Sequence, residues 1–476
     1  MTTKTNKIKV LYASPEVMPF GGTGGLGEVA GSLPGAVNKL KKSQVECRVI
    51  MPLYASVKEE YRKQMKFLGS MEIPVAWRSQ YMGIFELSRS GVTYYFVDNE
   101  YYFKRDGLYG FYDDCERFTF FSRAVLESSG ITGFEPDIVH TNDWQTALAS
   151  VFSKTIYRSK GIKTVFTVHN VEYQGRYGTG VLEDCIGLDP EDDRCLIMDD
   201  DVNLMKGAIE CADKFTTVSP TYARELTYPG SAFGLDGIIR DNEYKFLGIL
   251  NGIDTVSYDP MNDPYTKASY SAEKLDGKRK CKYDLQESLG LAKSDAPMIT
   301  MITRLVAPKG VDIVADMIDG LLTREDMQFV MLGTGDGKYE EFFRQLQSRY
   351  PDKVRSLIEF NTATAHRIYA GGDIFLMPSR SEACGLAQMI ACRYGNVPIV
   401  RLTGGLADSI KEWDGEEGNG FTFYDFNGQE LDYAIGRALD LYQHKIKWRR
   451  LVRHILEEDF TWARAAEVYH RMYVEL

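Results

Sequence analysis

Two cations in the second half of the chain are the clearest starting point for chemistry. Arg304 and Lys309 flank a short loop that directly follows the apolar run 298–303. An arginine offers a bidentate fork and a lysine a point charge, so the pair can contact one anion, such as a diphosphate. Two solvated surface cations are the plainer interpretation. Cations directly after the end of a buried strand more often have a functional role, so we interpret this loop as a candidate anion site.

A second segment, residues 378–388, also follows an apolar run and carries the strongest signal. Glu382 falls on its loop, and a helix is predicted to begin at Gly385 and Leu386. Free N–H groups at a helix start can hold a diphosphate, while a carboxylate can bind sugar hydroxyls. A solvated loop charge is the plainer interpretation of Glu382. Another glycine turn, which begins at Thr403, follows the next apolar run.

The first half of the chain carries a glycine-rich turn before a predicted helix. Glycines let the backbone approach a ligand closely, and the helix offers free N–H groups and the positive end of its dipole. The turn lacks the GxGxxG spacing of a nicotinamide site, and a tight structural turn is the plainer interpretation. Its candidate ligand-binding residues are Thr23, Gly24, Gly25 and Glu28.

Two polar clusters in the same half follow short strand-like runs. Residues 140–144 read His-Thr-Asn-Asp-Trp, and residues 167–170 read Thr-Val-His-Asn. A single histidine after a strand usually has a structural role, but two such clusters favour a shared site. Ligands of open α/β sheets bind at the carboxyl ends of the strands, so we expect Asp143, Trp144 and His169 to lie near that edge.

Short apolar runs alternate with helical patterns along the chain, which is typical of parallel sheets with helices on both faces. The segment 254–296 interrupts this rhythm with prolines and many charged residues, and we interpret it as a junction with one helix. The pattern therefore predicts two α/β domains. The predicted strands are 8–13, 45–51, 92–97, 138–140, 164–168, 215–218, 246–250, 298–303, 328–332, 358–360, 374–377 and 397–400.

The composition excludes several classes of protein. A chain of 476 residues, 44% hydrophobic and 26% charged, favours two or three globular domains. The net charge of −11 argues against nucleic acid or an anionic membrane as the main partner. The apolar runs are too short for a transmembrane helix, and residues 1–10 lack the apolar stretch of a signal peptide. The eight cysteines form no CxxC pair, so we expect reduced thiols in a cytoplasmic protein.

Taken together, these segments resemble those of bacterial glycogen synthases and plant starch synthases, which are retaining glycosyltransferases of the GT-B architecture. The resemblance covers nearly the whole chain and is specific only as a combination. It implies an α/β fold of two Rossmann-like domains that face each other across a cleft. The matching segments are 14–19, 143–144, 168–170, 173–175, 218–220, 234–237, 251–254, 304–310, 382–386 and 403–408.

The resemblance also implies roles for individual residues. Arg304 and Lys309 would neutralise the donor diphosphate, and Glu382 would hold the donor glucose. His169 would lie beside the reacting carbon, and Asp143 would lie on the acceptor side. No metal or other cofactor is implied, because the cations do the charge work that Mg²⁺ does elsewhere. Further donor-site candidates are Thr23, Gly24, Gly25, Glu28, Asn251, Gly385, Leu386 and Thr403, and the acceptor-site candidates are Asp143, Trp144 and Tyr173.

The chain departs from the family pattern at four positions. Gly22 stands where the family has a lysine on the donor phosphates, and Glu28 stands where an aspartate is usual. Pro308 replaces a glutamine, and Ala383 replaces a proline. The missing lysine is the most serious departure, because it removes a cation from the expected donor site. Arg176 is a candidate substitute.

We therefore expect a glucosyltransferase that moves glucose from a nucleotide sugar, ADP-glucose, to the non-reducing end of an α-1,4-glucan or maltooligosaccharide with retention. One alternative is a catalytically weakened homologue that binds glucan or partners an active synthase. Another is a related retaining transferase with a different nucleotide sugar or acceptor. The predicted domains are 1–252 on the acceptor side, 253–460 for the nucleotide sugar, and a helix at 461–476 that returns to the N-terminal domain.

Overall fold

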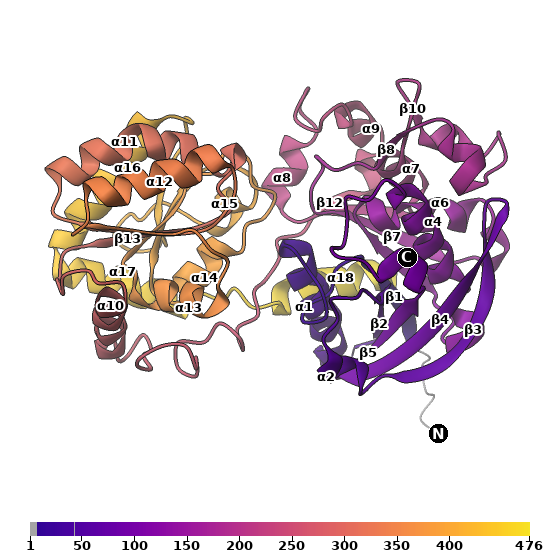
Figure 1. The fold of residues 1–476 in the computed structure, drawn as a ribbon, viewed down its shortest axis with the longest axis horizontal. Helices are drawn as coiled ribbons and strands as arrows, with labels where there is room; N and C mark the ends of the chain where they lie inside the picture. Colours follow the sequence, from indigo (N-terminus) through magenta and orange to yellow (C-terminus); the bar gives the residue numbers. More distant parts are fainter. Residues whose placement is uncertain (1–6, 42) are drawn as a thin grey trace. The chain divides into compact units, whose positions relative to one another are not determined.

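The computed structural model describes residues 7–41 and 43–476, and the chain divides into two compact units. One unit ends at Gly252 and also includes Trp462–Leu476, and the other comprises Ile253–Thr461. The chain therefore leaves the first unit once and returns to it at the end. Each unit contains its own large β-sheet (Figure 1).

The first unit is built on a nine-stranded sheet in the order β12-β11-β7-β6-β1-β2-β5-β4-β3. Neighbours are parallel except for the antiparallel pairs β3–β4 and β4–β5. The chain starts in the middle and extends outward in both directions, so the strand order reverses between β1 and β6, where such sheets bind ligands. The strands are β1 (Ile8–Ala13), β2 (Val45–Pro52), β3 (Lys66–Val75), β4 (Arg78–Arg89), β5 (Val92–Asp98), β6 (Ile138–Asn142), β7 (Lys163–Val168), β11 (Lys214–Thr217) and β12 (Phe246–Gly248).

The helices of this unit cover the sheet with their apolar sides. α6 (Trp144–Lys154) is buried along most of its length between α4 (Asp114–Glu127) and α7 (Leu204–Cys211). The last helix, α18 (Ala463–Glu475), packs against α1 (Gly25–Lys39) and β2 (Figure 1). A small sheet of β8 (Arg176–Gly178), β10 (Asp201–Asn203) and β9 (Ile197–Met198) follows β7, and the shorter helices include α2 (Glu59–Arg62), α3 (Glu100–Phe103), α5 (Ser129–Thr132), α8 (Pro220–Glu225) and α9 (Asp236–Asp241).

The second unit has a six-stranded parallel sheet in the order β15-β14-β13-β16-β17-β18. This is the doubly wound order, and it reverses between β13 and β16. Figure 1 shows α11, α12 and α16 on one face of the sheet and α10, α13, α14 and α17 on the other. The strands are β13 (Met298–Ile302), β14 (Gln328–Leu332), β15 (Val354–Leu357), β16 (Ile374–Met377), β17 (Val397–Arg401) and β18 (Phe421–Phe423).

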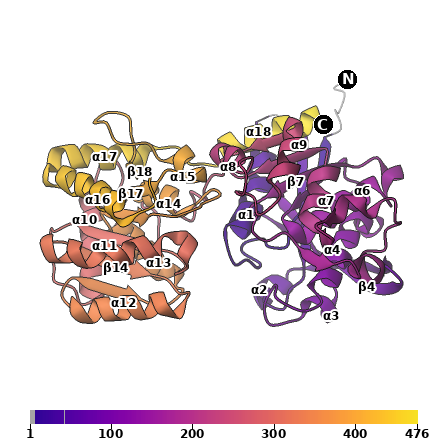
Figure 2. The same ribbon diagram turned by 90° about the horizontal axis from the view of Figure 1, so that it is seen from above.

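The helices of the second unit pack on this sheet through apolar faces. α11 (Val311–Arg324) buries Val314, Ile318, Leu321 and Leu322, which follow the 3–4 spacing expected of one helix face. Seen from above in Figure 2, α16 and α17 lie toward the β18 edge, and α12 lies at the opposite edge. The other helices are α10 (Asp276–Ser288), α12 (Gly337–Arg349), α13 (Thr362–Gly371), α14 (Ala387–Arg393), α15 (Gly404–Ser409), α16 (Gly428–Gln443) and α17 (Lys445–Glu457).

The sequence-based prediction of strands differs from the structure in several places. The strand placed at 358–360 lies at Val354–Leu357, where Val354 is buried beside β14. The hairpin β3–β4 was missed, because much of its outer strand is exposed and carries no continuous apolar run. It adds an antiparallel edge to an otherwise parallel sheet.

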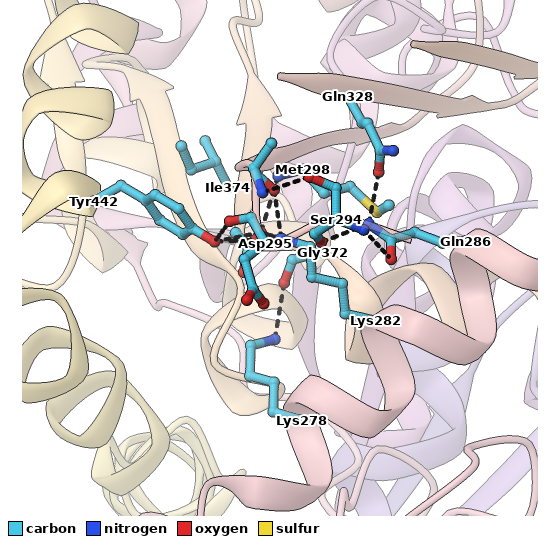
Figure 3. A network of polar contacts seen from close by, with 12 residues as sticks. Lys278, Lys282, Gln286, Ser294, Asp295, Met298, Gln328, Gly372, Ile374 and Tyr442 are labelled. Carbon is cyan, nitrogen blue, oxygen red and sulfur yellow. Dashed lines mark hydrogen bonds and ion pairs between the residues drawn. The ribbon is translucent and has the colours of Figure 1, made fainter. Parts of the chain in front are cut away.

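A buried polar network anchors α10 to the second sheet (Figure 3). Lys282 Nζ pairs with Asp373 Oδ2 at 2.6 Å, and the same carboxylate oxygen accepts from the Met298 N–H at 2.9 Å. One turn earlier, Lys278 Nζ donates to the carbonyls of Ala370, Gly372 and Tyr394. The network therefore fixes the first helix after the junction to the N-terminal ends of β13 and β16.

Candidate active site

The loops after β13 and β16 meet where the strand order of the second sheet reverses. Gly310 has φ +72°, and a Cβ there would lie 2.1 Å from the Pro378 carbonyl oxygen. Only glycine permits this approach. The Arg380 N–H also donates to the Pro308 carbonyl at 2.9 Å. Backbone packing therefore brings the Arg304–Lys309 loop against the loop that carries Glu382.

Within these loops, Lys309 and Glu382 form an ion pair. Lys309 Nζ lies 2.6 Å from Glu382 Oε2, which also accepts from Ser379 Oγ at 3.0 Å. The side chains are 20% and 11% exposed, respectively. Glu382 Oε1 has no hydrogen-bond partner in the described part of the chain, so it is available to a sugar hydroxyl. Lys309, predicted as a cation for a diphosphate, is thus already engaged by the carboxylate.

Arg304 is the cation of this edge that is not engaged within the protein. Its side chain is exposed, and across residues 7–41 and 43–476 it forms no ion pair or side-chain hydrogen bond. A guanidinium without a partner at the carboxyl edge of a sheet can bind an anion through two parallel N–H groups. The arrangement thus offers one free and one paired cation.

The glycine turn after β17 closes the same edge. A Cβ on Gly404 would lie 1.9 Å from the Glu382 carbonyl oxygen, and one on Gly405 would lie 2.2 Å from that of Cys384. Thr403, which is 4% exposed, precedes this contact. The turn thus packs directly on the loop of Glu382.

The helix expected to begin at Gly385 and Leu386 begins two residues later, at Ala387. Gly385 has φ +70°, in the left-handed region, so it ends the loop rather than starting the helix. The N–H groups of these two residues therefore belong to a loop, and α14 spans only 7 residues.

The reversal point of the first sheet gathers three predicted polar residues. Asn142 Nδ2 donates to the Ala13 carbonyl, so its Oδ1 accepts from the Tyr12 hydroxyl and from His169 Nε2, each at 2.9 Å. Asp143 Oδ1 accepts the His169 N–H at 2.7 Å. With Nε2 as the donor, a neutral His169 keeps Nδ1 as an acceptor. Asn142 and Asp143 therefore fix both the ring and the backbone of His169.

Burial controls the charges of these groups. It raises the pKa of Asp143 to about 7, although the hydrogen bond from the His169 N–H opposes this shift. It lowers the pKa of His169 to about 3, so this imidazole is neutral at physiological pH. Burial likewise lowers the pKa of His140 to about 3, and the neighbouring His169 adds to that effect. This edge of the first sheet therefore favours the neutral forms of its titratable side chains.

Asp143 also has a strained backbone. Its φ of 54° and ψ of 179° lie in a region that residues other than glycine rarely adopt. Two features stabilise this conformation. The Asp143 N–H donates to the Thr167 carbonyl at 2.9 Å, and α6 begins at the next residue. Such outliers cost about 1–3 kcal/mol and cluster at functional sites.

The other predicted residues of the first unit surround this edge. Thr23, Gly24 and Gly25 are exposed, and α1 begins at Gly25 with Glu28 in its first turn. Asn251 is 5% exposed, and its buried Oδ1 has no hydrogen-bond partner among residues 7–41 and 43–476. Unsatisfied buried acceptors are uncommon, and this oxygen is able to accept a hydrogen bond from a ligand.

The acceptor-side candidates differ in exposure. Trp144 packs edge-on against Phe118 and Tyr177, with ring centroids 5.3 and 6.1 Å apart. Tyr173 is 57% exposed. Arg176, the predicted substitute cation, instead lies 3.7 Å from Asp199 and 4.0 Å from Asp201. Two acidic neighbours therefore already balance its charge.

Three residues that contact the site were not singled out from the sequence. Glu16 binds the glycine turn, Tyr109 binds Glu16, and Ser379 binds Glu382. Glu16 lies in segment 14–19 and Ser379 in segment 378–388, so their places in these two motifs could have identified them. Tyr109 lies in a loop with no such signal.

Comparisons with known proteins identify the family of the chain. The family model described as the starch synthase catalytic domain matches residues 9–241, and that of group 1 glycosyl transferases matches residues 286–453. The glycogen synthases of Geobacillus thermodenitrificans and Lactobacillus acidophilus are 44% and 45% identical to the chain. Each alignment covers 98% of this chain, with 98% and 100% of the respective relative.

Solved structures extend the comparison to the fold. The catalytic domain of starch synthase IV from Arabidopsis thaliana, bound to ADP and acarbose, matches with a TM-score of 0.91 and 35% identity over 98% of this chain and 99% of that one. Sucrose-phosphate synthase from Thermosynechococcus elongatus matches with a TM-score of 0.62 and 15% identity over the same shares, which supports the fold alone.

In the described residues, no helix is long and apolar enough to cross a membrane.

Proposed function

The chain belongs to the family of glycogen and starch synthases, glycosyltransferases of the GT-B fold, and from that membership we propose ADP-glucose as its donor and the non-reducing end of an α-1,4-glucan as its acceptor. The observation that carries the proposal is the Lys309–Glu382 pair beside the free Arg304 at the reversal point of the second sheet. The structure of the starch synthase bound to ADP and acarbose supports an adenine nucleotide and a glucan-like acceptor.

In this proposal the second unit binds the nucleotide sugar. Arg304 and Lys309 neutralise the diphosphate, and the free Oε1 of Glu382 accepts a hydroxyl of the donor glucose. Gly385, Leu386 and Thr403 contribute backbone groups near the phosphates. The two cations replace a metal in stabilising the leaving diphosphate, so activity should survive a chelator such as EDTA.

The first unit acts on the reacting sugar and the acceptor. Neutral His169, held by Asn142 and Asp143, orients the sugar beside the reacting carbon. Asp143, Trp144 and Tyr173 lie on the acceptor side, and Thr23, Gly24, Gly25, Glu28 and Asn251 assist the donor. Retention follows if the acceptor attacks from the face that the diphosphate leaves.

The decisive experiment incubates the protein with ADP-glucose or UDP-glucose and maltoheptaose. Nucleotide release and the lengths of the glucan products are both measured. Longer chains with ADP release at a higher kcat/KM than UDP release would support the proposal. A higher kcat/KM with UDP-glucose would replace the donor, and binding without chain growth would support the weakened homologue to which Gly22 points.

A further inference from the structure

One buried carboxylate holds the glycine-rich turn of the first unit. Glu16 follows β1 and is 5% exposed. The Thr23 N–H donates to its Oε2 at 2.6 Å, and Thr23 Oγ1 donates to its Oε1 at 2.8 Å. The third donor is the Tyr109 hydroxyl, at 2.7 Å from Oε1. No cation pairs with Glu16 among residues 7–41 and 43–476, so these three donors alone satisfy it.

The loop that carries Tyr109 is itself fixed by a buried ion pair. Arg117 is fully buried, pairs with Asp114, and donates to the Leu108 carbonyl at 3.3 Å. Asp114 Oδ2 accepts the Gly110 N–H at 2.8 Å. The residues on both sides of Tyr109 are therefore attached to the same pair on α4.

The ring of Tyr109 is seated against aromatic neighbours that reach the acceptor side. Its centroid lies 5.9 Å from that of Phe118, and Phe118 lies 5.3 Å from Trp144. Burial holds the pKa of Tyr109 well above its usual range, so the hydroxyl stays protonated and donates. These contacts fix both the backbone and the ring of Tyr109 and so direct its hydroxyl at Glu16.

We propose that Tyr109 is a positioning residue for donor binding, which acts through Glu16 to hold the Thr23 turn. The inference rests on the proposed role of that turn at the donor. Tyr109 needs no contact with the substrate. Its hydroxyl fixes Glu16, and Glu16 fixes the N–H and the hydroxyl of Thr23 at the start of α1. Without the Tyr109 hydroxyl, Thr23 still donates to Glu16, but Glu16 is no longer bound to the loop that precedes α4.

The test compares Tyr109→Phe with the parent protein. We expect the KM for ADP-glucose and the Kd for ADP to rise about 3- to 10-fold, the loss typical of one ordinary hydrogen bond, because Tyr109 acts on the donor only through Glu16. We expect kcat to stay within about twofold and the KM for maltoheptaose to stay unchanged, because the hydroxyl does not touch the reacting atoms. Tyr112→Phe is the matched control, since Tyr112 is in the same loop and 94% exposed.

Two further variants separate the inference from the proposed function. Thr23→Val should weaken donor binding, and its combination with Tyr109→Phe should be less than additive, because both act through Glu16. Lys309→Ala reports on the donor site independently of this loop. Parental donor affinity in Tyr109→Phe with weakened affinity in Lys309→Ala would overturn the inference alone. Parental affinity in both would overturn the donor site as well.

A general structural role gives a different pattern. If Tyr109→Phe lowered kcat, donor affinity and acceptor affinity together with the melting temperature, the positioning role would be wrong. Should that variant fail to fold, Glu16→Gln keeps the size of the side chain while placing an amide against the Thr23 donors. It should then raise the donor KM selectively, and an unchanged donor KM would again overturn the inference.

Discussion

At the residue scale, the ion pair lets Lys309 and Glu382 stabilise each other in addition to the role proposed for each at the donor. The lysine neutralises a carboxylate that is only 11% exposed, and it lies beside the expected diphosphate. The carboxylate in turn orients the lysine and keeps one oxygen free. Removing either partner therefore leaves the other as a poorly solvated charge.

For this reason we expect Lys309→Ala to lower kcat/KM for the donor about 10- to 150-fold, equivalent to about 1.5–3 kcal/mol for a charge-assisted contact. Ser379→Ala removes only a neutral donor to the same carboxylate and should lower it less, about 2- to 10-fold. Steady-state kinetics with ADP-glucose measures both. Arg380→Ala is the control, because Arg380 pairs with Asp312 near the surface. Parental kinetics in Lys309→Ala would contradict the assignment.

Gly22 gives a second prediction at this scale. It does not adopt a positive φ, so its backbone accepts a side chain. A Cβ there would lie 3.3 Å from both Glu16 Oε2 and Met18 Sδ, so these atoms must give way slightly. We expect Gly22→Lys to raise turnover with ADP-glucose, because it restores a cation to the turn. Gly22→Ala controls for the crowding, and equal turnover in the two folded variants would show that the missing cation does not limit the enzyme.

At the element scale, α10 depends on its two buried lysines. The helix has a polar sequence, and Lys282 joins it to Asp373, the Ala296 carbonyl and the Tyr442 hydroxyl (Figure 3). Because Asp373 also receives the Met298 N–H, the ion pair ties the helix to the start of β13. The helix is thus held by specific polar contacts as well as by apolar packing.

We therefore expect Lys282→Met to destabilise the second unit by about 3–5 kcal/mol, because it leaves the Asp373 carboxylate buried without its cation. Thermal and urea denaturation measure the loss. Lys280→Met, an exposed change on the same helix, should have little effect. Adding Asp373→Asn to Lys282→Met should recover part of the stability, and no recovery would show that the buried charge is not the cause.

At the scale of the whole molecule, the first unit couples its site to its C-terminal helix. His140 Nδ1 contacts the Tyr473 hydroxyl at 2.6 Å, and its Nε2 contacts Thr167 Oγ1 at 2.6 Å. Tyr473 belongs to α18, the C-terminal helix of the first unit, which follows the entire second unit in the sequence. Folding of the site strand β6 is therefore linked to the last residues of the chain.

The titrating groups of this unit predict its pH dependence. His140 and His169 have pKa values near 3 when folded and about 6.5 when unfolded, so the unfolded state takes up both protons below pH 6.5. Asp143, with a folded pKa near 7 and an unfolded value of about 3.9, acts in the opposite direction. For these three groups, stability falls by about 1.4 kcal/mol per pH unit at most as pH drops from about 6 to 4.

Urea denaturation at several pH values tests this balance. Near pH 7 the residual protonation of the two unfolded histidines offsets that of the folded Asp143, so stability should be nearly constant above pH 7. Asp143→Asn removes the opposing group and should roughly double the loss of stability per pH unit between about pH 6 and 4. A variant whose pH profile matches the parent would show that Asp143 titrates normally.

The sequence alone determined most of the secondary structure and the positions of the site loops. Apolar runs marked nearly all the parallel strands of both sheets, because strands buried on two faces must be apolar. Polar residues directly after those runs predicted a candidate site at this edge, because parallel strands end at a shared edge. The hairpin β3–β4 was not predicted, since its half-exposed edge strand β3 has no continuous apolar run.

Only the tertiary structure decided which side chains meet. Lys309 and Glu382 are 73 residues apart, Glu16 and Tyr109 are 93 apart, and His140 and Tyr473 are 333 apart. The sequence predicted that both Lys309 and Arg304 contact a diphosphate, but within the described residues the fold pairs Lys309 with Glu382 and gives the Arg304 side chain no partner. Residue types set what each group can do, while contacts between distant segments depend on backbone packing, such as that of Gly310 on Pro378, which no local pattern records.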